Sequence, residues 1–147
     1  MVAMASSGPA KVTLPTDEQI LVTRRLAAPR HLVYRAWTAP ELVKQWRSGG
    51  HGTVAVAEID PRVGGRWRYV IVADGGFEVA FHGEYRELVP NERIVTTEVY
   101  AMPGAPALPE ADEPLNIVTF TELRAHPAHS HATPRSSRWL VLGRYCR

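Results

Sequence analysis

Aromatic residues are the side chains of this sequence best suited to form a ligand site. Aromatic rings line apolar pockets, and tyrosine hydroxyl and tryptophan N–H groups add polar contacts within them. Those expected on the inward faces of the predicted elements are Trp37, Trp46, Trp67, Tyr69, Phe81, Tyr85 and Phe120. The same rings would equally suit an ordinary core, since buried aromatic residues dominate cores. The sequence therefore predicts an aromatic interior and leaves open whether it holds a ligand.

A catalytic role would need a titratable group in that interior. Tyr69, Tyr85 and Glu98 are the candidates for a cyclase-like or hydrolase-like activity. Glu98, together with Thr96, faces inward in only one of two registers, because both faces of the strand predicted over residues 93–100 carry apolar residues. Because these groups do not form a clear cluster, we assign no catalytic residue and predict binding rather than catalysis.

The histidines and the cysteine offer weaker sites. His82 and Glu84 share one strand face, which alternation sends outward to solvent. His126, His129 and His131 resemble a metal-binding tract but have no cysteine or carboxylate beside them, and Cys146 has no base placed near it. The glycine-rich segments at 49–52 and 64–65 lack the Lys-Ser/Thr of a phosphate loop. We expect no metal and no cofactor.

Composition narrows the class of protein. The chain has 147 residues, 45% of them hydrophobic, but no apolar run long enough to span a membrane. One cysteine excludes an internal disulfide framework and predicts a reducing, cytoplasmic setting. Residues 1–122 carry twelve Lys and Arg against fifteen Asp and Glu, so the net charge of +2 comes from five arginines after Glu122. A mildly acidic body argues against nucleic-acid binding.

The periodicity of the apolar residues predicts an α+β domain. A strand over 20–26 precedes two short helices that start at Pro29 and Pro40, where proline suits the first turn. Strands follow over 53–59, 66–71, 77–88, 93–100 and 115–123, with a hairpin turn at Asp74-Gly75-Gly76. We expect an antiparallel meander, a disordered lead-in over 1–18, one domain over 19–123 and an atypical basic tail over 124–147.

An ordered set of segments resembles one known family. The segments are Ala28-Pro29-Arg30, Arg35-Ala36-Trp37-Thr38, Pro40-Glu41-Leu42, Glu58-Ile59-Asp60, Gly64-Gly65-Arg66-Trp67, Phe81-His82-Gly83-Glu84-Tyr85, Val89-Pro90-Asn91-Glu92 and Val118-Thr119-Phe120-Thr121-Glu122. The chain resembles, over about 20–123, the family named after the C-terminal domain of the heat-shock-protein-90 ATPase activator. That family is a branch of the helix-grip (START-like, SRPBCC) superfamily.

The resemblance implies a curved antiparallel sheet that grips a long C-terminal helix, with a cavity between them. Bacterial members look like ligand binders, so a hydrophobic small molecule or lipid is the expected partner. A chaperone-interaction module is a further alternative that rests on the family name. The seven aromatic residues named above are the expected ligand-binding residues.

The tail departs from the family pattern. Residues 124–147 contain two prolines, no acidic residue and no helical period, so the long helix is expected to be absent or replaced. The codons of Ala125–His131, read from their second base, permit Arg-Thr-Leu-Leu-Thr-Leu-Thr, an alternating strand, which suggests an out-of-frame tail. A bare sheet face would favour a homodimer or aggregation, unless Trp139–Leu142 form a substitute strand.

Overall fold

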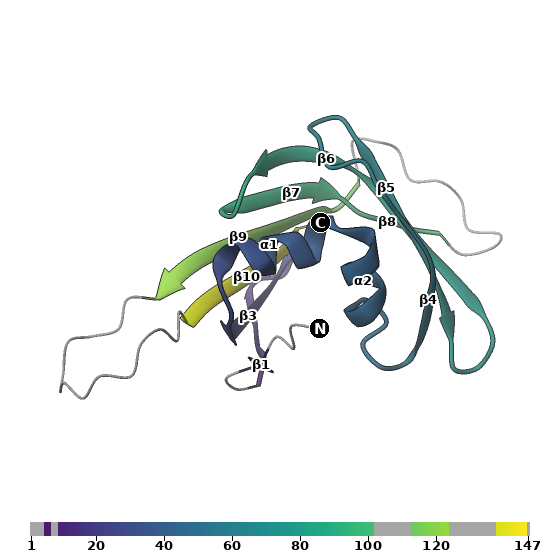
Figure 1. Cartoon of the computed structure of the whole chain (residues 1–147), viewed down its shortest axis with the longest axis horizontal. Helices are drawn as coiled ribbons and strands as arrows, with labels where there is room; N and C mark the ends of the chain where they lie inside the picture. The colour runs from purple at the N-terminus through teal and green to yellow at the C-terminus, as the bar shows by residue number, and fades with distance from the viewer. Residues whose placement is uncertain (1–4, 7–8, 102–112, 124–137, 147) are drawn as a thin grey trace.

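The fold consists of one large antiparallel sheet with two short helices on one of its faces (Figure 1). The structure is a computed structural model that describes residues 5–6, 9–101, 113–123 and 138–146. The helices are α1 (Arg30–Thr38) and α2 (Pro40–Trp46). The strands are β1 (Ala5–Ser6), β2 (Lys11–Thr16), β3 (Gln19–Ala27), β4 (Gly52–Ile59), β5 (Arg66–Ala73), β6 (Glu78–Val89), β7 (Arg93–Thr97), β8 (Val99–Ala101), β9 (Leu115–Leu123) and β10 (Arg138–Cys146).

The sheet is a meander from β4 onward. Its order is β1-β3-β10-β9-β7-β6-β5-β4, while β2 pairs with β3 and β8 pairs with β6. Strand β10 lies between β3 and β9, with Val141 opposite Phe120 on one side and Arg24 on the other. The sheet curves around α1 and α2, and this inner face holds the core (Figure 1).

The two helices are positioned by the residues around their shared boundary. Pro40 opens α2 at a place where its missing N–H costs no hydrogen bond. The indole Nε1 of Trp46 donates to the backbone oxygen of Ala36 at 2.9 Å, which ties α2 to α1. Tyr34 of α1 packs its ring edge on Phe120 of β9, with 5.9 Å between ring centroids. Together these contacts fix both helices on the inner face.

A break between β7 and β8 sets which side chains face the helices. Glu98 leaves the strand ladder, and its N–H donates to the oxygen of Pro114 at 2.9 Å. Strand β6 pairs first with β8 and then with β7. Between these two stretches, Thr97 Oγ1 accepts a hydrogen bond from the N–H of Glu84 at 3.0 Å. Cross-strand partners share a face, and Tyr85 pairs with Thr96, which pairs with Asn116. Thr96 and Glu98 therefore face inward, which settles the register that the sequence left open.

The structure agrees with most of the expected elements and differs at both ends. Residues 11–16 form β2, although we expected a disordered lead-in over 1–18. The described part of the tail, residues 138–146, is a strand in the middle of the sheet, which contains the substitute strand expected at Trp139–Leu142. Strand pairing on both sides of β10 explains this, since each neighbour supplies hydrogen bonds. His126, His129 and His131 lie outside the described residues.

Gly83 offers a test of the packing between β5, β6 and β7. A Cβ at this position would collide with the carbonyl oxygen of Thr97 and come 2.8 Å from Trp67 Nε1. We expect Gly83→Ala to lower the free energy of unfolding by about 1–3 kcal/mol in urea denaturation, because the backbone has to shift. Gly75→Ala is the control, since its Cβ would make an ordinary 3.4 Å contact with the Phe77 ring. Equal stabilities of the two variants would contradict the close approach at Gly83.

Candidate ligand-binding site

A small cavity lies on the inner face of the sheet, between the helices and strands β5 to β9. Its volume is about 30 Å³, which is room for about one or two water molecules. The lining residues are Trp37, Trp46, Arg47, Trp67, Tyr69, Tyr85, Ile94, Thr96, Glu98, Asn116 and Val118. In this conformation the interior is therefore almost filled by side chains.

Five of the seven aromatic residues expected at a ligand site line this cavity, and two do not. Phe81 packs beside the core with its ring against that of Tyr100, at 5.3 Å between centroids. Phe120 is buried against Tyr34. Among the lining residues, the ring centroids of Trp37 and Trp46 are 4.6 Å apart. The aromatic side chains thus pack on one another, and their role in binding stays a prediction.

A partly buried ion pair lies beside the cavity. Arg47 Nη2 lies 3.1 Å from Glu98 Oε1, and the two side chains are only 18% and 14% exposed. The second carboxylate oxygen, Oε2, accepts from Asn116 Nδ2 at 3.1 Å. The Arg47 guanidinium also lies over the rings of Tyr69 and Phe81, at 5.5 and 5.3 Å from their centroids. Both oxygens of Glu98 are therefore engaged.

Arg47 and Asn116 are site residues that sequence reasoning missed. Asn116 shares its strand face with Val118 and Phe120, so a polar residue stood at an inward position of a predicted strand. That signal was present in the sequence. Arg47 is the C-cap residue of α2, directly before the loop predicted from Ser48, and a charged residue at a helix end is ordinarily expected to face solvent.

Two buried tyrosines add neutral hydroxyl groups. Tyr69 and Tyr85 are hydrogen-bonded to each other through their side chains. Burial raises the pKa of Tyr69 to about 12, with the carboxylate of Glu98 adding to the shift and Arg47 opposing it. Burial also raises the pKa of Tyr85 above its ordinary value. Both phenols stay protonated at neutral pH, so they can donate hydrogen bonds but are poor bases.

One buried donor at this site has no acceptor. Trp67 is 4% exposed, and its Nε1 has no hydrogen-bond partner among the described residues. A buried N–H without an acceptor costs about 1–3 kcal/mol. Trp67 borders both this cavity and the pocket on the outer face of the sheet, and its Nε1 lies beside Gly83, which lines the outer pocket.

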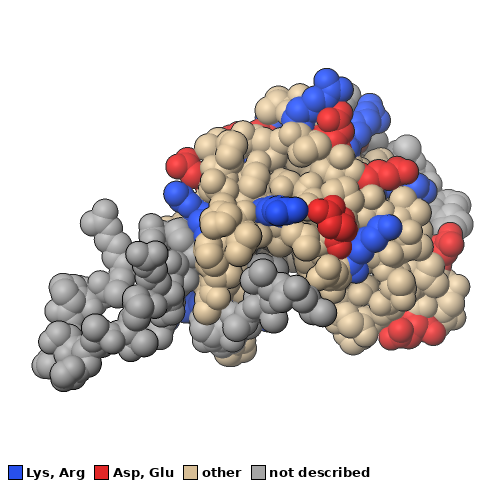
Figure 2. Space-filling model, in the orientation of Figure 1, with Lys and Arg blue, Asp and Glu red and all other residues tan. Residues whose placement is uncertain are grey.

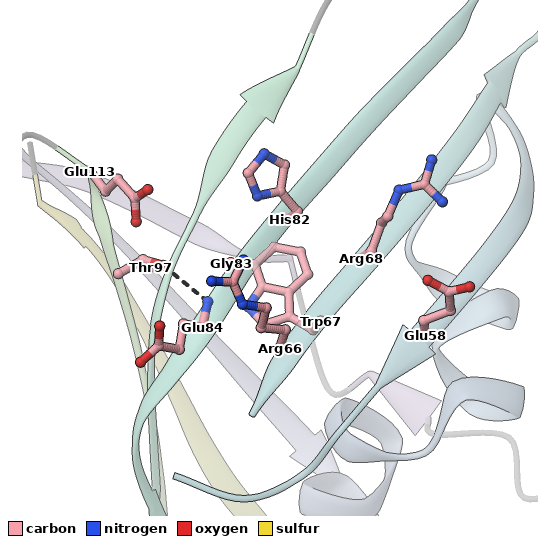
Figure 3. A pocket seen from close by; sticks show the side chains of 9 residues that line it. All are labelled: Glu58, Arg66, Trp67, Arg68, His82, Gly83, Glu84, Thr97 and Glu113. Atoms are coloured by element: carbon pink, nitrogen blue, oxygen red, sulfur yellow. Dashed lines mark hydrogen bonds between the residues drawn. The ribbon is translucent and has the colours of Figure 1, made fainter. Parts of the chain in front are cut away.

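A second, wider pocket lies on the opposite, outer face of the sheet. Figure 3 shows side chains of Arg66, Arg68 and His82 on it, and its volume is about 510 Å³. His82 is exposed, as strand alternation predicts, and Glu84 is ion-paired with Arg86 at 3.5 Å. No group of three or more metal-ligating side chains occurs in the part of the chain that the structure describes. This surface is a solvated array of mixed charges.

The face that carries the helices shows no concentration of one charge. In Figure 2, Lys and Arg are interspersed with Asp and Glu on a mostly neutral surface. A nucleic-acid site requires a basic stripe that follows the phosphates. Neither described helix is long and apolar enough to cross a membrane.

The curved antiparallel sheet with two helices on its aromatic inner face is consistent with the α+β helix-grip class, although the described residues include strand β10 and no long C-terminal helix. Comparison with known families matches residues 27–133 to the family described as Activator of Hsp90 ATPase homolog 1-like protein. The chain belongs to this family. A comparison with curated protein sequences finds no significant match.

Solved structures share the same fold. A protein from Rhodobacter sphaeroides is 16% identical with a TM-score of 0.72, over 95% of this chain and 79% of that chain. A protein from Chromobacterium violaceum is 28% identical with a TM-score of 0.68, over 88% and 79%. An HSP90 activator from Plasmodium falciparum is 16% identical with a TM-score of 0.57, over 88% and 72%.

Double-mutant cycles test the partly buried ion pair. We expect the Arg47→Ala and Glu98→Ala changes each to cost about 1–3 kcal/mol of unfolding free energy, and their coupling to exceed about 1 kcal/mol, because either change leaves a largely desolvated charge without its partner. The control is the pair of Arg35 and Glu41, which are 3.8 Å apart with side chains 66% and 64% exposed. Its coupling should stay below about 0.5 kcal/mol. Equal coupling in both cycles would contradict a special role for the buried pair.

The tyrosines predict a loss of stability at high pH. Their folded-state pKa values lie above the ordinary value of 10, so the stability they contribute is complete below that pH. Between pH about 10 and about 12, the tyrosine hydroxyl is ionised in the unfolded chain but still protonated in the folded one. Rising pH in this range therefore favours unfolding, and the stability is lost. Unfolding measured between pH 8 and 11 should show this decline, and Tyr69→Phe should reduce its slope. An unchanged slope in that variant would contradict the burial argument.

Proposed function

We propose that this protein binds a small, largely apolar molecule on the inner face of its sheet, between the helices and strands β5 to β9. The observation that carries the proposal is a polar cluster enclosed by aromatic rings. The Arg47–Glu98–Asn116 cluster lies among tryptophan and tyrosine side chains. Apolar walls with a few fixed polar groups are typical of small-molecule sites.

The energetics favour a functional reason for this cluster. Desolvating an ion pair costs free energy that its attraction often fails to offset, and an apolar pair of similar size is frequently more stable. Stability alone therefore gives no reason for Arg47 and Glu98 in these positions, whereas polar recognition of a ligand does.

The cavity of about 30 Å³ has to widen to admit a ligand. Helix α2 is the shorter of the two described helices, and its movement would have to break the 2.9 Å hydrogen bond from Trp46 Nε1 to Ala36. Gly49 and Gly50 follow it with positive φ angles of 61° and 83°, a conformation that favours glycine.

The enzymatic alternative has less support. Glu98 is held by Arg47 and Asn116, and the protonated phenols of Tyr69 and Tyr85 are not bases. The chaperone-interaction alternative and the homodimer remain predictions from the sequence. Among the described residues, the exposed apolar side chains of Val12, Leu14, Ile20 and Val22 on β2 and β3 are the surface on which either would rest.

Two substitutions on neighbouring residues of β9 test the location. Val118→Phe fills the cavity from the inner face, whereas Ile117→Phe adds the same ring on the outer face. With the neutral probe 2-phenylethanol, we expect tryptophan fluorescence titration to show binding by the wild type that weakens at least about ten-fold in Val118→Phe. Circular dichroism checks the fold of both variants. Equal binding by both variants, or none by the wild type, would count against the proposal.

A further inference from the structure

We propose that the Arg47 side chain occupies the place of a cationic group of the ligand, so that the site selects a small aromatic molecule with a positively charged nitrogen. This inference rests on the proposed ligand binding and adds the chemical class of the ligand. In the closed conformation the protein's own guanidinium fills the position, and the ligand's cation replaces it.

The surroundings of the guanidinium form a site for a cation. Tyr69 and Phe81 present ring faces at 5.5 and 5.3 Å from the Arg47 Cζ atom, within the range of cation–π attraction. Glu98 supplies the negative charge at 3.1 Å. A carboxylate beside aromatic faces is the combination that recognises ammonium and related groups.

The charge balance favours a cationic ligand over an anionic one. An anion that engaged Arg47 would have to draw it away from Glu98 and would then lie near that carboxylate, which Asn116 Nδ2 holds in place. A cation that replaced Arg47 would leave the local charge unchanged and keep Glu98 paired. Like charges at short range in a water-poor site are strongly unfavourable.

Movement of the Arg47 side chain out of the interior would also provide the volume that a ligand needs. The cavity of about 30 Å³ is bounded by this side chain, so its withdrawal would add the volume of the guanidinium and its stem. Arg47 caps the C-terminal end of α2, with its N–H bonded to Val43 at 3.0 Å, and is followed by Ser48 and the two glycines. Its side chain is already 18% exposed, which places it near an exit to solvent.

The test uses three probes with one aromatic body and different charges: 2-phenylethylammonium, 2-phenylethanol and phenylacetate. Arg47→Ala vacates the position, and calorimetric titration compares its affinities with those of the wild type. We expect the ammonium probe to bind Arg47→Ala at least about ten-fold tighter than it binds the wild type, and tighter than the other two probes bind Arg47→Ala. Adding Glu98→Gln to this variant should remove the preference for the cation.

Three results would overturn the inference. If Arg47→Ala binds the alcohol as tightly as the ammonium ion, the site takes apolar molecules without charge selection, and only the proposed function stands. If phenylacetate binds tightest, Arg47 is not a stand-in for a cation. If a folded Arg47→Ala binds none of the probes, both the inference and the proposed function fail.

Arg47→Gln provides a second variant in case Arg47→Ala does not fold. Its amide can still donate to Glu98, so the carboxylate keeps a partner while the positive charge is gone. The same order of affinities, ammonium before alcohol before carboxylate, is expected. A different order in this folded variant would overturn the inference by itself.

Discussion

Withdrawing a guanidinium and a carboxylate partly from water is costly, and this chain does so between two short helices and a curved sheet. Arg47 and Glu98 meet at 3.1 Å, Asn116 engages the other oxygen of Glu98, and rings of Tyr69 and Phe81 cover the guanidinium. Hydrogen bonds and ring contacts from the surrounding elements offset this desolvation cost. The break after β7, the register of β9 and the end of α2 all converge on this cluster.

The sheet sets the positions of the polar side chains on its inner face, and the helices cover that face. The break at Glu98, between β7 and β8, turns a carboxylate toward the inner face, where Thr96 and Asn116 also lie. Helix α2 then carries Trp46 and, at its end, Arg47 over that face. A closed interior with an internal cation is therefore a resting conformation, from which a ligand with matching chemistry can displace one side chain.

The sequence predicted the strands, the helices and the aromatic interior, because alternation and helical spacing depend on local side-chain burial. The residues that it missed depend on long-range pairing. Arg47 reaches Glu98 only because β7, β9 and α2 meet in space, and a charged residue at a helix end is ordinarily expected to face solvent. Strand β10 depends likewise on two neighbours, β3 and β9, that lie far from it in sequence. Strand alternation already indicated that Asn116 is a polar residue on the inward face, and the sequence analysis overlooked it.

Nuclear Overhauser effects between bound 2-phenylethylammonium and assigned side-chain protons test the central claim most directly. The account predicts contacts from the probe to the ring protons of Tyr69 and Trp46, on the inner face. Contacts confined to His82 and Arg68, on the outer face, would contradict it.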